Sequence, residues 1–83
     1  MHKILVEIYN PASNNSYDVF IPLKSPVYEV VYLLSNTISE LSQGQYKPSE
    51  QTILCDRKTG NLFDINKTIE ELGLKNGSKL MIL

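Results

Sequence analysis

The sequence predicts an α+β fold in which one main helix packs on one face of a mixed sheet of four or five strands. Two runs near the N-terminus alternate apolar and polar residues, and a stretch with apolar residues at helical spacing follows them. Short apolar runs separated by turn residues fill the C-terminal part. A sheet with one helix across it is the simplest way to bury the helix stripe, so we expect a single core.

The N-terminal part of the chain is predicted to be a β-hairpin. Apolar residues recur at every second position over residues 3–9 and again over residues 17–23, which is the pattern of half-buried strands. The Asn-, Ser- and Pro-containing residues 10–16 between them favour a turn. The side chains that we place toward the helix are Ile4, Val6, Ile8, Val19 and Ile21.

The main helix is predicted to begin at Ser25-Pro26. The Ser25 hydroxyl suits the N-cap, and the fixed φ of Pro26 suits the first helical position. Gly44 favours an end of the helix, and Pro48 opposes its continuation. Apolar residues at spacings of three and four predict one buried stripe, which comprises Val27, Val30, Val31, Leu34, Ile38 and Leu41.

Three further strands are predicted in the rest of the chain. Residues 51–56 form the third strand, on which we place Ile53 and Cys55 toward the helix, and residues 62–64 form a short fourth strand. Residues 79–83 form the last strand.

A capping-box pattern precedes the last strand. Thr68 stands three residues before Glu71, which predicts one turn of helix ending near Gly73. The predicted order is therefore two strands, the main helix, two strands, a helical turn and a final strand, in one domain over residues 1–83.

Composition excludes several classes of function. The chain has 83 residues, enough for one domain, and a formal net charge of −1 without a basic stripe, which argues against nucleic acid binding. Apolar runs such as residues 80–83 are far short of the ~20 residues of a membrane-spanning helix. No signal-peptide pattern opens the sequence, and one cysteine suits a reducing compartment, so we expect a cytoplasmic protein that does not insert into the membrane.

Catalytic residues are not evident in the sequence. Cys55 is the only thiol and His2 the only imidazole, which is too few for a zinc site or an activated nucleophile with its base. Cys55 fits a buried and unreactive position on its strand. The four glycines are spaced as single turn residues and form no phosphate-binding loop. We predict that the chain is not an enzyme and has no cofactor or metal.

The closing segment carries the first family resemblance. Residues 68–80 (TIEELGLKNGSKL) resemble the Leu-x-x-x-x-Ile/Leu-x-x-Gly-x-x-Leu ending of ubiquitin-like β-grasp domains. In such an ending Leu72 and Leu74 fill the core, and Gly77 permits a turn with positive φ. Leu80 and Ile82 then return to the core.

A narrower resemblance covers the second strand and the start of the helix. Residues 17–22 (YDVFIP), followed by Pro26-Val27 and Val30-Val31, are similar to the Tyr-Asp-Leu-x-Val-Pro-x-x-x-Pro-Ile pattern of the YukD/EsaB-like family. The resemblance implies a cytosolic accessory or regulatory component of a Gram-positive type VII (WXG-type) secretion system. Such a protein acts by binding other proteins.

Two alternative functions stay open. A ubiquitin-like modifier or sulfur carrier needs an extended Gly-Gly carboxyl terminus to enter an adenylating enzyme. We expect no such Gly-Gly tail after Leu83, which lies in the predicted last strand, and this disfavours a modifier or sulfur carrier. A generic ubiquitin-like domain with an unrelated partner also fits the sequence.

The outward face of the sheet is the predicted protein-binding site. Alternation turns several apolar residues away from the helix, where a ubiquitin-like strand order would make them neighbours in one patch. By resemblance, Leu54 falls where ubiquitin has the central Ile of its main binding patch. The predicted patch comprises Leu5, Phe20, Leu54, Met81 and Leu83. Incidental exposure is the alternative, and a homodimer formed through this face is a variant of the first interpretation.

Tyr28 and Tyr32 form a predicted secondary surface. They lie one turn apart on the exterior of the helix, and tyrosine is enriched at protein interfaces. Their rings covering the edge of the core is the alternative that we favour slightly.

Overall fold

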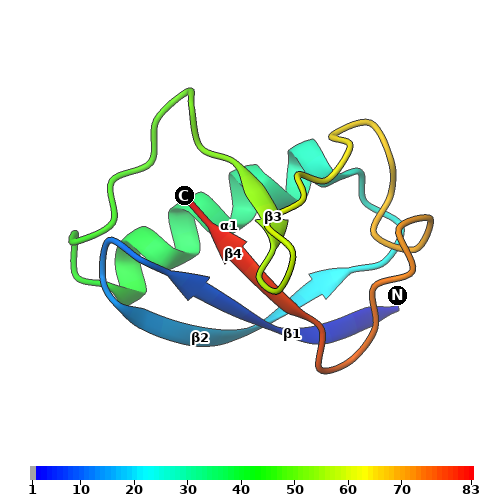
Figure 1. Ribbon diagram of the computed structural model, residues 1–83, viewed down its shortest axis with the longest axis horizontal. Coiled ribbons are helices and arrows are strands. Elements are labelled where there is room, and N and C mark those ends of the chain that lie inside the picture. Colours follow the sequence, from blue (N-terminus) through cyan, green and yellow to red (C-terminus); the bar gives the residue numbers. More distant parts are fainter. Residues whose placement is uncertain (1) are drawn as a thin grey trace.

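The computed structural model describes residues 2–83 and contains one four-stranded sheet crossed by one helix (Figure 1). The elements are β1 (Lys3–Asn10), β2 (Asn15–Pro22), α1 (Val27–Leu41), β3 (Leu54–Asp56) and β4 (Lys79–Ile82). The strands lie in the order β2-β1-β4-β3. β1 and β4 are parallel and the other neighbouring pairs are antiparallel, so the sheet is mixed as predicted.

The β1–β2 hairpin is tied to the end of β4 by a buried asparagine. Asn10 is buried, and its side-chain amide donates a hydrogen bond to the carbonyl oxygen of Ile82 (3.1 Å). Its Oδ1 accepts hydrogen bonds from the backbone N–H and the hydroxyl of Ser13, both at 2.9 Å. This network satisfies the Asn10 amide, which would be costly to bury without partners. The turn between β1 and β2 comprises residues 11–14 and is shorter than the predicted turn over residues 10–16.

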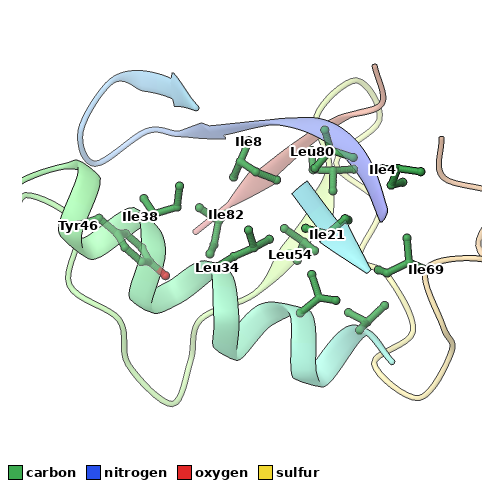
Figure 2. Close-up of a cluster of buried hydrophobic side chains, with 13 residues drawn as sticks. Ile4, Ile8, Ile21, Leu34, Ile38, Tyr46, Leu54, Ile69, Leu80 and Ile82 are labelled. Carbon is green, nitrogen blue, oxygen red and sulfur yellow. The ribbon is translucent and has the colours of Figure 1, made fainter. Parts of the chain in front are cut away.

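The core lies between the sheet and α1 and confirms most of the predicted inward side chains. Figure 2 shows Leu34 and Ile38 of α1 facing Ile8 and Ile82 of the sheet. Ile4, Val6, Ile21 and Leu80 are also buried, and Val19 packs against the cluster while partly exposed.

Leu41 is a correction to the predicted helix stripe, because its side chain is exposed. Tyr46 is buried near Ile38 at this end of α1 (Figure 2). The Tyr46 hydroxyl donates to Thr52 Oγ1 (3.0 Å) and its backbone N–H donates to Ser42 Oγ (3.0 Å). The loop after the helix therefore closes the core here, and α1 ends without needing Leu41 inside.

The predicted N-cap is also wrong. Helix α1 begins at Val27 with Pro26 at the N-cap, and no side chain caps it. The free N–H groups of the first turn find backbone carbonyls from a distant loop instead. Val27 N–H donates to Lys67 O (2.8 Å) and Tyr28 N–H donates to Ile65 O (3.1 Å). Backbone carbonyls of this distant loop thus cap the helix, which is the role that the sequence predicted for the Ser25 hydroxyl.

Two short elements predicted in the C-terminal part differ in the structure. Residues 62–64 make only one isolated bridge, between Leu62 and Cys55, and do not form a strand. The capping box is present, since Thr68 N–H donates to Glu71 Oε1 (2.9 Å) and Glu71 N–H donates to Thr68 Oγ1 (3.1 Å). It stabilises a turn rather than a helix.

Neighbouring residues complete the C-terminal part of the core. Ile69 is fully buried, while Leu72 and Leu74, which were predicted to fill the core, pack against it only partly buried. Gly77 has a φ of 88°, as the predicted turn requires.

The third strand is shorter than predicted and its faces are reversed. Leu54 is only 3% exposed and belongs to the core, whereas Ile53 is 37% exposed. The register explains this, because Leu54 lies opposite Ile82, and directly opposed residues of an antiparallel pair share a face. Cys55 lies opposite Met81 and so takes the other side. The placement of Ile53 and Cys55 toward the helix was wrong.

Candidate protein-binding surfaces

The outward face of the sheet carries four of the five residues predicted for it. Leu5 and Phe20 lie opposite each other on β1 and β2, and Phe20 is 61% exposed. Met81 is half-buried and Leu83 is exposed at the end of β4. Leu54 does not belong to this surface, because its side chain is buried on the helix side.

Charged and aromatic residues divide the outward face. Glu7 lies between Asp18 of β2 and Lys79 of β4 in the register, so a charged row separates Leu5 and Phe20 from Met81. The predicted single patch is therefore two smaller apolar areas.

Arg57 strengthens this division. Its guanidinium carbon lies 4.4 Å from the centre of the Tyr9 ring, and its Nη1 is 3.4 Å from Glu7 Oε2. The Tyr9 ring is therefore covered by a cation. A partner docking flat on this face would have to displace or match these charges.

A second surface, which we call the α1–β3 groove, lies between the helix and the β3 edge of the sheet. It is a hollow of about 260 Å³ whose lining includes no charged residue. Leu62 and Ile65 on one side are 64% and 56% exposed, and Tyr28 on α1 is also exposed. The residues that line it are Tyr28, Val31, Thr52, Ile53, Leu54, Leu62, Phe63 and Ile65.

The groove exists because the chain between β3 and β4 folds back on the helix. Asp56 N–H donates to Asn61 O (3.0 Å) and Phe63 N–H donates to Leu54 O (3.4 Å), so residues 61–63 follow the outer edge of β3. Two residues later, Ile65 O accepts from the first turn of α1. The segment thus forms one wall of the groove and α1 the other.

A neighbouring hollow of about 350 Å³ extends the groove along α1. It shares Tyr28, Val31 and Thr52 with the α1–β3 groove, and it adds Tyr32, which is largely exposed. Glu50 is the only charged residue in its lining. The structure thus places Tyr28 and Tyr32, the predicted secondary surface, along the groove rather than flat over the core.

Sequence reasoning missed Ile53, Leu62 and Ile65 as surface residues. Ile53 was placed in the core, and Leu62 was assigned to a strand. One feature of the sequence could have identified Leu62 and Ile65 as surface residues. Both lie in a segment rich in turn residues, where no helix or strand requires apolar side chains. Apolar residues in such a segment either fill a core or form an exposed patch, and here they are exposed.

The described residues include no cluster suited to a metal ion, and the thiol of Cys55 is buried. Among residues 2–83 no cluster of three or more His, Cys, Asp or Glu side chains is placed to hold a metal ion. Cys55 is buried, and burial raises the pKa of its thiol, with the neighbouring Asp56 carboxylate acting in the same direction. Within the same range, no helix is long and apolar enough to cross a bilayer.

Comparison with known proteins finds similarity in the three-dimensional fold and none in the sequence searches. In sequence comparisons, no protein-family model and no curated protein matched the chain. Among solved structures, the EccD5 ubiquitin-like domain from Mycobacterium xenopi matches with a TM-score of 0.82 and 17% identity, covering 100% of this chain and 94% of that domain. This chain has the ubiquitin-like β-grasp fold.

Two other matches show how widely that fold is used. The ubiquitin-like domain of the Mycobacterium tuberculosis type VII secretion system protein ECCD1 has a TM-score of 0.80 at 13% identity, with 100% of this chain and 99% of that one covered. A chain of a toluene 4-monooxygenase complex has a TM-score of 0.81 at 16% identity, with 98% and 96% covered. At such identities the likeness concerns the fold, and the function has to be argued from the surfaces.

Proposed function

We propose that this chain is a non-enzymatic protein-binding domain that serves a type VII secretion system as a cytoplasmic accessory or regulatory component. The observation that carries the proposal is the gathering of exposed apolar side chains around the α1–β3 groove. Exposed apolar patches on a small domain are typical of protein interaction sites. A catalytic role has no comparable support, because the one thiol is buried.

The secretion context rests on likeness and on sequence. Two of the matching structures are EccD ubiquitin-like domains, and one of them comes from a type VII secretion system protein. The structural matches cover this chain completely and nearly all of each EccD domain. The YDVFIP segment on β2 independently favours the YukD/EsaB-like family of Gram-positive bacteria.

The experiment is affinity capture of partners with the tagged chain from a lysate of the source organism, followed by mass spectrometry. Secretion-system proteins are expected with the wild-type chain. Two folded variants locate the surface, because both replace exposed residues. Ile65→Asp changes the α1–β3 groove, and Phe20→Asp changes the outward face.

Each outcome of this capture has a definite meaning. Loss of the secretion proteins with Ile65→Asp alone assigns binding to the groove. Loss with Phe20→Asp alone assigns binding to the Leu5/Phe20 area of the sheet, as the sequence predicts. Recovery of no secretion protein by the wild-type chain would overturn the proposed secretion role.

A further inference from the structure

The shape and charge of the α1–β3 groove restrict the kind of segment that fits it. Its deeper part is apolar, with Ile53, Leu62 and Ile65 on the side opposite α1. Farther along the helix, the extension of the groove is lined by Pro48 and Glu50. A segment lying along the groove would meet apolar side chains at one end and a carboxylate at the other.

Glu50 is held in a defined turn and forms no ion pair with any other residue of the range 2–83. Ser49 N–H donates to Thr52 Oγ1 (3.0 Å), and Thr52 N–H donates to Ser49 O (3.1 Å), so the turn that carries Glu50 closes on itself. The ion pairs found over residues 2–83 are Lys24–Glu70 and Arg57–Glu7, and neither involves Glu50. No Lys or Arg lines either hollow. A basic side chain of a partner is the complement that this end of the groove lacks.

The backbone of the groove favours a helical occupant over an extended one. An extended segment gains affinity by pairing with a free sheet edge, but residues 61–63 already occupy the outer edge of β3 through the Phe63–Leu54 and Asp56–Asn61 hydrogen bonds. A helix satisfies its own backbone groups and needs only a groove for its apolar side chains. From Tyr28 to Asn36 the two hollows follow α1 for roughly 12 Å, which is about two turns of helix.

We infer that the α1–β3 groove binds a short amphipathic helix of a partner protein. The partner helix would insert two apolar side chains, three or four residues apart, between Tyr28 and Ile65. About two turns farther along, it would place a Lys or Arg beside Glu50. This binding mode deepens the proposed function, since it names the kind of segment that a protein partner would supply.

Selection from a phage-displayed library of twelve-residue peptides tests this binding mode. The wild-type domain is expected to enrich peptides with an apolar pair at helical spacing and a basic residue about two turns farther along. The Glu50→Lys domain is expected to enrich the same apolar pair with Asp or Glu in place of the basic residue. Loss of the charge preference, or enrichment of no peptide, would overturn the inference.

Nuclear magnetic resonance then locates the bound peptide on the domain. Amide shifts are expected at Tyr28, Val31, Thr52 and Ile65, and Ile65→Asp is expected to weaken binding at least about tenfold. The matched control is Phe20→Asp, an exposed residue on the outward face, which is expected to leave affinity unchanged. Peptide-induced shifts confined to β2 would contradict binding in the groove. Groove shifts that depend on the concentration of the domain itself would indicate self-association and would also contradict the inference.

The peptide selection and the lysate capture fail independently. If secretion-system proteins are still captured by Ile65→Asp, the proposed function stands and the groove inference falls. If the groove selects basic amphipathic peptides but the wild-type chain captures no secretion protein, the groove inference stands and the secretion role falls.

Discussion

The outward sheet face and the α1–β3 groove both expose apolar side chains, but they differ in what lies between those side chains. On the sheet face, the charged row at Glu7 separates the apolar residues, and Arg57 covers Tyr9. In the groove the lining is unbroken by charge until Glu50. We therefore expect the continuity of the apolar lining, more than the number of exposed apolar residues, to decide which surface binds a partner.

The largest effect is expected from Leu54→Asp compared with Ile53→Asp, two neighbouring changes of which only the first falls on a buried side chain. Leu54→Asp buries a charge without a partner and is expected to lower the free energy of unfolding by more than about 3 kcal/mol. Ile53→Asp alters the groove wall and is expected to cost less than about 1 kcal/mol, because Ile53 is partly exposed. Urea unfolding followed by circular dichroism measures both. The reverse order would show that the register of β3 is wrong.

A smaller effect is expected from Thr68→Ala, which removes the hydroxyl of the capping box. The expected loss is about 1 kcal/mol, as for other capping hydroxyls. Thr68 follows Lys67, whose carbonyl caps α1, so amide shifts should change at Val27 and Tyr28 beside the groove and stay constant at Phe20.

Thr37→Ala is the matched control for this change. Its hydroxyl bonds the Leu33 carbonyl within α1 and links no separate segments, so no loss of stability is expected. Equal losses for the two threonines would show that the capping box does not support the groove.

Arg57→Ala is expected to have a still smaller effect on stability, confined to the sheet face. Its contacts with Tyr9 and Glu7 are partly exposed, so the change in free energy of unfolding should be below about 1 kcal/mol. The Tyr9 ring resonances should shift while those of Tyr28 do not. Arg57→Lys keeps the charge but loses the planar stacking, and it is expected to retain only part of the Tyr9 shift.

At neutral pH the smallest effect is expected from Glu71→Gln, because a glutamine can still accept the capping hydrogen bond. The bond from the Thr68 N–H lowers the pKa of the Glu71 carboxyl. A pKa that is lower in the folded state means that the unfolded state binds more protons, so stability is lost as the pH falls below about 4. Glu71→Gln should flatten this loss in urea titrations between pH 5 and 2, and an unchanged slope would contradict the role of the box.

Asp56 provides the corresponding test next to the sheet face. Hydrogen bonds from the Thr59 N–H, and further ones from the Thr59 hydroxyl and Lys58 N–H, lower the pKa of its carboxyl. Asp56→Asn is therefore expected to flatten the acid loss of stability as well. Because the two carboxylates lie in separate turns, their effects should add in the double variant.

The order of the main strands and the helix, and most of the core residues, could be predicted from the sequence alone. Alternation at Ile4, Val6 and Ile8 has one consistent parity, and the helix stripe has one consistent period, so each has one way to bury its apolar side. The capping box at Thr68 was also readable, because its two hydrogen bonds are local in the chain.

The faces of β3 and the existence of the groove depend on contacts between segments that are far apart in the chain. Ile53, Leu54 and Cys55 are three consecutive apolar residues, so alternation cannot choose a face, and the pairing of Leu54 with Ile82 makes that choice. The cap of α1 comes from Ile65 and Lys67, far along the chain, and no local pattern encodes that contact. The same long-range bonds place Leu62 and Ile65 opposite Tyr28, so the candidate site arises from contacts that the sequence pattern does not contain.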